Sequence, residues 1–328
     1  MKNMKVLVTG AAGFIGSHLV EHLASKNYKV IAFDRYNSNN DWGWLENTPY
    51  KNKIEFVLGD IRDYDSVYNV IKKCNAVFHL AALIGIPYSY ISPSAYLKTN
   101  VEGTLNVLEA AKNLKTKQII ITSTSEVYGT ATKKNLKEND ILAAQSPYAA
   151  SKIAADQFSL SYFKSFNLPV KIVRPFNTFG PRQSSRAVIP TIISQILKKN
   201  KEIKIGNINS KRDFLYVEDL CLAFEKIYKS KAFYGEVVNV GANSEISIKD
   251  LILKISKIMN VKIKIKIESK RIRPKLSEVE RLKCNNNKIK KTLNWKLKVS
   301  FENGIKKVIE WMNQDEIKKI YKEKNYNI

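Results

Sequence analysis

Short apolar runs alternate with helically spaced apolar positions through the first two-thirds of the chain. The apolar runs, which predict strands, are Met4–Thr9, Val30–Phe33, Ile54–Leu58, Ala76–Leu80, Gln118–Ile121 and Val170–Val173. The helical patterns between them are Phe14–Lys26, Tyr64–Lys73, Thr99–Asn113 and Tyr148–Phe166. Because strands separated by helices pair in parallel and are covered on both faces, the pattern predicts an α/β fold with a doubly wound parallel sheet.

The pattern becomes less regular from about residue 181. Helical spacing recurs at Val188–Lys199, Val217–Lys229, Ile248–Ile258 and Phe301–Met312. Short strands are predicted at Lys201–Ile205, Val237–Val240 and Val261–Ile267. No linker rich in Pro or Gly separates the two parts of the sequence. We therefore expect a sheet domain over residues 1–180 and a smaller mixed α/β lobe over residues 181–328, interleaved with the first.

Length and composition allow a large core and argue against a membrane protein. The chain has 328 residues, of which 44% are hydrophobic and 26% charged. No apolar stretch approaches the roughly 20 residues that span a bilayer. The first predicted strand begins almost at Met1, so the amino terminus is expected to be a strand and not a signal peptide. We expect no membrane partner.

The cysteines and histidines predict neither disulfides nor a metal site. Cys74, Cys221 and Cys284 are scattered without a CxxC pair, which is typical of free thiols in a reducing compartment. His18 and His22 lie one helical turn apart, but no acidic or cysteine residue completes a ligand set with them. We therefore expect a cytoplasmic protein that works without a metal ion.

The chain is strongly basic, with 55 Lys+Arg against 30 Asp+Glu and a net charge of +25. Such a charge has two explanations, a nucleic-acid partner or a Lys-rich solvated surface. We favour the second, because the lysines in Val261–Ile267 alternate with Val and Ile and so share one face of a strand. No nucleic-acid partner is expected, although a positive field would help to capture a diphosphate substrate.

A glycine-rich turn follows the first predicted strand and precedes the first predicted helix. Gly10 allows a tight turn, Gly13 lets the backbone approach a pyrophosphate, and Gly16 lets the helix pack on the sheet. The pyrophosphate would lie at the helix amino terminus, where free N–H groups attract anions. Asp34 ends the second strand, where a carboxylate binds ribose hydroxyls and favours NAD over NADP; the adjacent Arg35 weakens that preference.

Two further strand ends are candidates for the same cofactor. Asp60 and Ile61 follow the third strand, where they could touch adenine or, alternatively, cap the next helix. Leu80, Ala81 and Ala82 follow the fourth strand and offer small residues where backbone must pass close to the cofactor.

Tyr148 and Lys152 stand one helical turn apart and so share a helix face. A free tyrosine has a pKa of about 10, and a nearby ammonium ion favours its phenolate. Tyr148 could then remove a hydroxyl proton as hydride leaves the same carbon, while Lys152 holds the nicotinamide ribose. Ser123 and Thr124, at the end of the fifth strand, supply hydroxyls for the same substrate oxygen. The alternative is a surface helix with an exposed tyrosine.

These motifs together resemble those of a known family, over nearly the whole chain. The matching residues are Gly10–Gly16, Asp34, Asp60–Ile61, His79–Ala82, Asn100, Ser123–Gly129, Tyr148, Lys152, Arg174–Asn177, Gly180–Arg182 and Arg212–Asp219. They resemble the extended short-chain dehydrogenase/reductases of the NAD-dependent epimerase/dehydratase family, which modify nucleotide sugars. The chain looks most like the sugar-nucleotide 4,6-dehydratases of legionaminic acid biosynthesis. The runs specific to that subfamily are Tyr36–Ser38, Trp42–Leu45, Thr122–Gly129, Arg174–Gln183, Ala187–Thr191 and Arg271–Val279.

The resemblance implies a Rossmann domain that binds NAD, a substrate-binding second lobe and a nucleotide-diphosphate sugar as substrate. It implies a homodimer through the Thr99–Asn113 and Tyr148–Phe166 helices. The residues expected to contact the cofactor are Gly10, Gly13, Phe14, Ile15, Gly16, Asp34, Asp60, Ile61, Leu80, Ala81, Ala82, Asn100, Ser123, Tyr148 and Lys152.

The resemblance also implies a mechanism. Tyr148 deprotonates the sugar 4-hydroxyl while C4 passes hydride to NAD⁺, and the new ketone acidifies the proton on C5. Glu126 removes that proton, the 6-hydroxyl leaves as water, and the hydride returns to C6. The product is a 4-keto-6-deoxy sugar. The expected catalytic residues are Tyr148, Lys152, Glu126, Thr124 and Ser125.

One position departs from the pattern of the glucose 4,6-dehydratases, which carry an Asp-Glu pair where this chain has Ser125 and Glu126. A serine hydroxyl is too weak an acid to protonate the leaving hydroxyl unaided. Glu126, once protonated by C5, could return the proton while Ser125 positions it. Relatives that decarboxylate UDP-glucuronate carry the same Ser-Glu pair, so the pair alone does not separate the two reactions.

The resemblance assigns the grip on the substrate to residues beyond the catalytic pair. Asn177 would contact the sugar or phosphate, and Val188 would flank the base. Arg212 and Arg273 would bind the diphosphate, for which the planar fork of arginine is suited. The alternative for the arginines is a surface salt bridge, such as Arg212 with Asp213 or Asp219. Trp42 and Trp44 could form a cofactor lid or a local hydrophobic staple.

The leading prediction is an NAD-dependent 4,6-dehydratase of UDP- or GDP-linked N-acetylglucosamine, a lyase serving legionaminic-type (nonulosonic) acid or surface-glycan synthesis. A UDP-sugar 4-epimerase or a UDP-glucuronate decarboxylase on the same scaffold is the nearest alternative. A non-catalytic dinucleotide- or RNA-binding protein is the alternative of another class.

Overall fold

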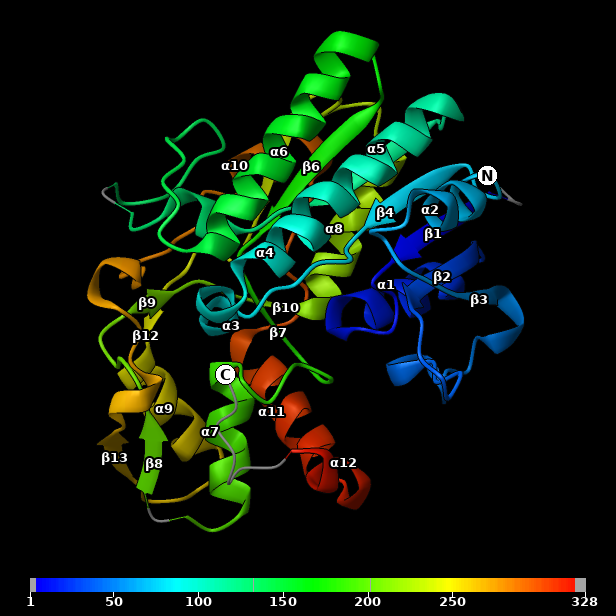
Figure 1. The fold of residues 1–328 in the computed structure, drawn as a ribbon. Coiled ribbons are helices and arrows are strands. Elements are labelled where there is room, and N and C mark those ends of the chain that lie inside the picture. Colours follow the sequence, from blue (N-terminus) through cyan, green and yellow to red (C-terminus); the bar gives the residue numbers. More distant parts are fainter. Residues whose placement is uncertain (1–3, 132, 201, 322–328) are drawn as a thin grey trace.

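The computed structural model describes residues 4–131, 133–200 and 202–321. Its centre is a seven-stranded sheet in the order β11-β6-β5-β4-β1-β2-β3, in which every neighbouring pair is parallel (Figure 1). The predicted doubly wound parallel sheet is therefore confirmed. Its strands are β1 (Lys5–Thr9), β2 (Lys29–Arg35), β3 (Ile54–Gly59), β4 (Ala76–His79), β5 (Gln118–Thr122), β6 (Val170–Pro175) and β11 (Val237–Val240).

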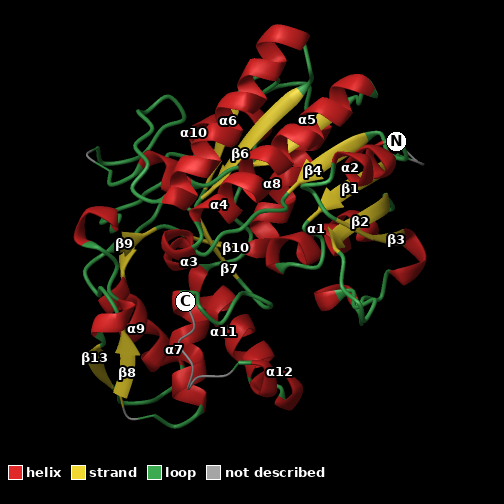
Figure 2. Ribbon diagram, in the orientation of Figure 1, coloured by secondary structure: helices red, strands yellow, loops and turns green. Residues whose placement is uncertain are grey.

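Alternate side chains of each strand pack against different helix layers, as expected for a sheet buried on both faces. In β1, Val6 and Val8 lie in one buried cluster with residues of α1 and α8, whereas Leu7 lies in a second cluster with residues of α2 and α5. Figure 2 shows these helices running beside the yellow strands. The helices that flank the sheet are α1 (Phe14–Ser25), α8 (Val217–Lys229), α2 (Tyr64–Ile71), α5 (Gly103–Asn113) and α6 (Pro147–Phe166).

A smaller lobe lies below the sheet in Figure 1 and is made mostly of residues after 181. Ile192, Ile252 and Ile305 from three of its helices are completely buried in its core, which is continuous with one core of the sheet. Its elements are α7 (Val188–Leu197), β8 (Glu202–Ile205), α9 (Ile248–Ile258), β13 (Lys264–Ile267), α11 (Phe301–Met312) and α12 (Asp315–Ile320).

The remaining elements connect the two parts. Two small pairings, β7 with β10 in parallel and β9 with β12 antiparallel, lie between the sheet and the lobe. They and the other helices are β7 (Asn177–Phe179), β9 (Lys211–Arg212), β10 (Phe214–Tyr216), β12 (Ile246–Ser247), α3 (Ile86–Ile91), α4 (Pro93–Tyr96) and α10 (Asn287–Leu293). The short 3₁₀ turns are Gly43–Leu45, Lys51–Lys53, Ser125–Tyr128, Ser269–Arg271 and Lys275–Ser277, and Leu97–Glu102 is π-helical.

The structure corrects the sequence pattern at two places. The helix predicted from Thr99 is π-helical up to Glu102 and α-helical only from Gly103. The strand predicted over Val261–Ile267 begins at Lys264, and its apolar face is only partly covered, because Ile265 is half-buried while Ile267 is exposed. Alternation of side chains alone does not say whether a neighbouring element covers the apolar face.

Within the described ranges, no helix is both long and apolar enough to cross a membrane. The same part of the chain contains no group of three or more His, Cys, Asp and Glu side chains that could hold a metal ion. His22 instead lies 2.7 Å from the Glu225 carboxylate, which joins α1 to α8.

Replacing Gly16 by alanine is expected to destabilise the fold. A Cβ at this position would stand 2.0 Å from the carbonyl oxygen of Gly10, so the turn or the helix must shift. Overpacking of this kind costs about 1–3 kcal/mol or more, which urea unfolding would measure. Gly85→Ala is the matched control, because its Cβ would meet no atom nearer than 3.5 Å and should change stability by less than about 0.5 kcal/mol. Equal stability of Gly16→Ala and the parent chain would contradict this packing.

Candidate active site

The glycine-rich turn is held tightly against the neighbouring strand end. Gly10 has φ of +67°, and a Cβ there would stand 2.9 Å from the backbone of Ala81. Gly13 donates its N–H to the carbonyl of Gly10 at 3.2 Å, and Gly13 is exposed to solvent. Phe14 and Ile15 begin α1 behind it. Backbone N–H groups at this helix start therefore lie beside a turn that has no side chains, which fits a bound pyrophosphate.

Asp34 lies beside the same turn. Its carboxylate accepts hydrogen bonds from the N–H of Ala12 at 2.6 Å and of Arg35 at 2.7 Å. A surface pocket at this point is lined by Ala12, Asp34, Arg35, Asn37, Asn39, Asp41 and Gly43. The carboxylate thus both anchors the turn and faces a pocket, as a ribose-binding acid requires.

The two tryptophans next to this pocket have different surroundings. Trp42 stacks on Phe56 with ring centres 4.7 Å apart, and the Lys51 ammonium lies 5.5 Å from its ring. Trp44 packs edge-on against Trp311 of α11 at 5.4 Å. Trp42 is therefore a local apolar contact on β3, whereas Trp44 joins the pocket loop to the carboxyl-terminal helices.

The loop after β4, which also carries residues predicted to contact the cofactor, lies directly against the turn at Gly10. Leu80, Ala81 and Ala82 follow β4, and both Leu80 and Ala81 donate N–H groups to the hydroxyl of Thr9 at 3.1 Å. Asn100 is completely buried and clamps Leu83 through its carbonyl and its N–H, at 2.9 and 2.8 Å. Asn100 therefore holds the loop after β4 in place.

Asp60 and Ile61, which follow β3, make contacts away from the glycine turn's own hydrogen bonds. Asp60 is engaged by the guanidinium of Arg62 at 2.5 Å, and Ile61 is buried against α5 near Gly103. The helix-cap alternative for Asp60 is wrong, because Asp63 is the residue that accepts from the N–H groups of Asp65 and Ser66. The hydrogen bonds from the Arg62 guanidinium lower the pKa of the Asp60 carboxyl.

Tyr148 and Lys152 lie on α6, which begins after Ser146 caps the N–H of Ala149 at 3.1 Å. Both side chains are buried, so the alternative of an exposed tyrosine on a surface helix is wrong. Burial raises the pKa of Tyr148 above its ordinary value, while a hydrogen bond with Thr124 opposes the rise. Burial lowers the pKa of Lys152 to about 8, and its Nζ donates to the carbonyl of Thr122 at 2.6 Å.

Ser125 and Glu126 lie in the 3₁₀ turn after β5 and are both buried. The Thr124 hydroxyl accepts from the N–H of Glu126 at 3.2 Å, which fixes the start of this turn. Burial lowers the pKa of Arg212, and the charge of Glu126 opposes that shift. Burial raises the pKa of Tyr148, and the charge of Glu126 adds to that rise, so the carboxylate lies within electrostatic reach of both groups. The turn therefore brings a carboxylate to the tyrosine that the helix supplies.

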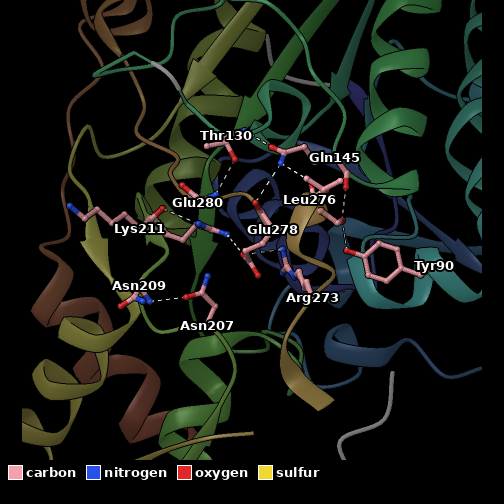
Figure 3. A network of polar contacts seen from close by, with 12 residues as sticks. Tyr90, Thr130, Gln145, Asn207, Asn209, Lys211, Arg273, Leu276, Glu278 and Glu280 are labelled. Carbon is pink, nitrogen blue, oxygen red and sulfur yellow. Dashed lines mark hydrogen bonds and ion pairs between the residues drawn. The ribbon is translucent and has the colours of Figure 1, made fainter. Parts of the chain in front are cut away.

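Arg212 and Arg273 converge on a carboxylate that the sequence did not assign. Glu278 lies 3.1 Å from Nη2 of Arg212 and 3.9 Å from Nη1 of Arg273 (Figure 3). The suggested partners Asp213 and Asp219 are wrong, because their carboxylates accept backbone N–H groups of other segments. Glu278 belongs to the run Arg271–Val279, but nothing in its spacing from Arg212 indicated the contact.

The segment that carries Glu278 is hydrogen-bonded to Gln145, just before the start of α6. Gln145 donates to the carbonyl of Leu276 at 2.9 Å, and the Ser277 hydroxyl donates to the carbonyl of Gln145 at 2.5 Å (Figure 3). Tyr90 of α3 lies 2.6 Å from the same Ser277 hydroxyl. Three separate parts of the chain therefore meet within a few residues of Tyr148.

Asn177 and Val188 complete the predicted set. Asn177 begins β7 and pairs in register with Phe214, two residues after Arg212, and its Oδ1 is buried without a hydrogen-bond partner among the described residues. Val188 begins α7 and packs against the core of the smaller lobe, half-buried.

Comparisons with known proteins agree on the family. Residues 7–308 match the family described as GDP-mannose 4,6 dehydratase. The dTDP-D-glucose 4,6-dehydratase of Homo sapiens is 33% identical, with 95% of this chain and 90% of that protein covered. A dTDP-D-glucose 4,6-dehydratase of Dictyostelium discoideum is 36% identical over 79% of this chain and 62% of its own length.

Solved structures give the same result and include epimerases. The dTDP-glucose 4,6-dehydratase of Bacillus anthracis, in complex with NAD, superposes with a TM-score of 0.85 at 30% identity, with 97% of this chain and 100% of that chain covered. The UDP-N-acetylglucosamine 4-epimerase of Methanobrevibacter ruminantium superposes with a TM-score of 0.84 at 31% identity, with 95% and 99% covered. This chain therefore belongs to the GDP-mannose 4,6 dehydratase family, sugar-nucleotide dehydratases and epimerases within the NAD-dependent extended short-chain dehydrogenase/reductases.

Proposed function

We propose that this chain is an NAD-dependent 4,6-dehydratase of UDP- or GDP-linked N-acetylglucosamine, giving a 4-keto-6-deoxy sugar for legionaminic-type acid or surface-glycan synthesis. The observation that carries the proposal is the buried Glu126, whose N–H donates at 3.2 Å to the hydroxyl of Thr124, the residue that hydrogen-bonds the Tyr148 phenol. An oxidation at C4 needs only the tyrosine and the lysine. A buried carboxylate beside them adds a group that can take a proton from a neighbouring carbon.

The residues at the glycine turn fit NAD. The side-chain-free turn at Gly10 and Gly13 would hold the pyrophosphate, and Asp34 would bind the adenosine ribose at the pocket. Lys152 would hold the nicotinamide ribose. Bound NAD would supply the hydride acceptor for oxidation at C4 and the hydride donor for C6.

Tyr148 accepts the proton of the sugar 4-hydroxyl in this proposal. Burial raises its pKa, so it needs help from a neighbouring positive charge to act as a base near neutral pH. Lys152 supplies that charge while it is protonated. Because burial lowers the pKa of Lys152 to about 8, the help is lost as the pH rises through that value.

Glu126 moves the second proton. It takes the proton from C5, which the C4 ketone has acidified, and gives it to the 6-hydroxyl, which leaves as water and leaves a C5–C6 double bond. When the hydride is added to C6, C5 takes a proton from solvent, and Tyr148 returns to solvent the proton that it took from the 4-hydroxyl. Ser125 is buried next to it and positions the leaving hydroxyl. One carboxyl group thus acts first as base and then as acid, which removes the need for a separate acid at position 125.

The arginines bind the diphosphate, with Asn177 close to the sugar end. Arg212 and Arg273 share the single carboxylate of Glu278, so two positive charges face one negative charge. A diphosphate can use the remaining donors, because guanidinium groups bind phosphate oxygens in a fork. We also propose a homodimer through α5 and α6, since α6 exposes Phe158 and Phe166.

A second candidate function is 4-epimerisation or decarboxylation of a UDP sugar. It is favoured by the similarity to the Methanobrevibacter epimerase and by the putative UDP-glucose 4-epimerase of Methanocaldococcus jannaschii, which is 32% identical over 94% of this chain. These reactions need the same oxidation at C4 but no loss of water.

Mass spectrometry of the product tests the proposal. The protein with NAD is incubated with UDP- and GDP-N-acetylglucosamine, and a product lighter by one water is expected from at least one of them. UDP-glucuronate serves as the comparison, because carbon dioxide release from it indicates the decarboxylase. A product of unchanged mass and changed stereochemistry would indicate the epimerase and exclude dehydration.

Glu126→Gln is expected to separate oxidation from elimination. The amide cannot accept the C5 proton, so water loss should fall by about a hundredfold or more, while Tyr148 still allows oxidation at C4. Exchange of the C5 proton with deuterated water should stop, and the reduced cofactor should accumulate on the enzyme. Ser125→Ala is the matched control and should retain C5 exchange. Normal turnover by Glu126→Gln would show that another group removes the C5 proton.

Arg212→Gln is expected to weaken substrate binding. Loss of a charge-assisted contact with the diphosphate costs about 1.5–3 kcal/mol, so KM should rise roughly tenfold to a hundredfold with a smaller effect on kcat. Lys211→Gln is the control, because Lys211 is adjacent but exposed and its removal should leave KM within about twofold. The same KM for both variants would place the diphosphate elsewhere.

A further inference from the structure

A third polar side chain continues the face of α6 that carries the tyrosine and the lysine. Asp156 follows Lys152 by four residues, as Lys152 follows Tyr148, so the three lie one above the other along the helix. Asp156 is completely buried, and Lys152 is 3% exposed. An isolated carboxylate is costly to bury, so Asp156 must be held by specific partners.

All of its hydrogen bonds use one oxygen. Oδ2 accepts from the Ser123 hydroxyl at 2.8 Å and from Nε of Arg174 at 3.0 Å, and Nη2 of Arg174 lies 2.9 Å away. Oδ1 is buried and accepts no hydrogen bond from any described residue. Burial raises the pKa of the Asp156 carboxyl, and the buried Arg174 guanidinium, which is always charged, opposes that rise and favours the ionised carboxylate. Arg174 therefore contacts only the Oδ2 side of the carboxylate, and Oδ1 is left without a hydrogen bond from the described residues.

The Ser123 contact links this carboxylate to the catalytic turn. Ser123 also donates its N–H to the carbonyl of Val173 at 2.7 Å, so it is fixed between β6 and α6 at the end of β5. The next residue is Thr124, which hydrogen-bonds the Tyr148 phenol. Asp156 therefore helps to set where the turn stands relative to the tyrosine on the same helix.

The charge of Asp156 also acts on Lys152. The only hydrogen-bond acceptor of Lys152 among the described residues is the neutral carbonyl of Thr122, and none of the described ion pairs includes it. On β4, His79 is neutral at ordinary pH, because burial lowers its pKa to about 3. Tyr96 of α4 faces Tyr148 with ring centres 6.2 Å apart, and Glu126 acts on Tyr148 from the 3₁₀ turn. Asp156 is the charged group that raises the pKa of Lys152 against burial.

We propose that Asp156 is a positioning residue of this active site: its buried carboxylate holds the Ser123–Thr124 strand end against α6 and keeps Lys152 an ammonium ion. The predicted effect of Asp156 on turnover rests on the proposed dehydratase function, whereas its effect on the protonation of Lys152 does not. The Tyr148 and Lys152 motif extends, in this chain, to a third residue one further turn along the helix.

Titration of Lys152 tests the proposal without a substrate. Lysines labelled at Cε are followed by NMR against pH in the NAD-saturated protein, and the Lys152 signal is assigned by its absence in Lys152→Met. Assignment is needed because burial also lowers the pKa of Lys171 to about 8. In Asp156→Asn the Lys152 midpoint should fall by about one pH unit or more. A purely structural role for Asp156 would leave the midpoint where it is.

Two further variants keep the test decisive. Ser123→Ala removes one hydrogen bond of Asp156 and keeps its charge, so the midpoint should stay within about 0.3 pH units of the parent chain. Asp156→Asn leaves Arg174 unpaired in the interior and can fail to fold. Asp156→Asn with Arg174→Gln removes both charges, and the midpoint should fall here by less than in Asp156→Asn, because loss of the Arg174 charge acts in the opposite direction. If the folded Asp156→Asn protein, or the folded double variant where Asp156→Asn does not fold, keeps the Lys152 titration midpoint of the parent chain, the proposal is wrong.

Turnover provides a separate readout. If the chain dehydrates a nucleotide sugar, the alkaline limb of its kcat profile should move to lower pH in Asp156→Asn by the same amount as the Lys152 midpoint, with KM within about twofold. A midpoint that moves while the alkaline limb stays would show that Lys152 is tuned by Asp156 but does not govern turnover, and would overturn the catalytic part. Absence of water loss by the parent chain would contradict the proposed function and leave the titration result standing.

Discussion

The parallel register of β1, β4, β5 and β6 is the constraint on which the site depends. Thr9 pairs with His79, His79 with Ile121 and Thr122 with Val173, so the carboxyl ends of these strands lie level at one edge of the sheet. The glycine turn, the loop after β4 and the turn with Glu126 all begin at this edge. A slip of one residue would turn every side chain of a strand to the other face, so burial on both faces holds the register.

Burial determines how the charged groups at this edge behave. Lys152 and Tyr148 are both inside the protein, and burial disfavours the charged form of each. The hydroxyl of Thr124 opposes the effect of burial on the pKa of Tyr148, and the carboxylate of Asp156 opposes its effect on the pKa of Lys152. The pair is thus close to a change of protonation, which is a common property of catalytic acids and bases.

The segments after β7 bring two arginines and a glutamate toward the same edge of the sheet. Arg212 comes from β9, and Arg273 and Glu278 come from a segment more than sixty residues later, yet these three meet. The contacts of Gln145 with Leu276 and of Tyr90 with Ser277 tie that segment to the sheet domain. The segment that carries Arg273 and Glu278 is therefore hydrogen-bonded to Gln145, just before α6.

Local periodicity and short motifs determined much of this protein. Alternating strand and helix patterns predicted the parallel sheet and most of its helices, because they depend on neighbours two to four residues apart. The strand–glycine–helix order predicted the turn at Gly10, and the spacing of Tyr148 and Lys152 predicted one shared helix face. Asp156 belonged to the same periodicity and could have been found by extending it one turn.

Only the tertiary structure decided the long-range pairings. It placed Val237–Val240 beside β6 and paired Arg212 with Glu278 instead of Asp213 or Asp219. It also left part of the apolar face of β13 exposed, which the alternation of Lys with Val and Ile did not indicate. A side chain's partner and its burial depend on segments that are distant in sequence, and a linear pattern contains no information about their approach.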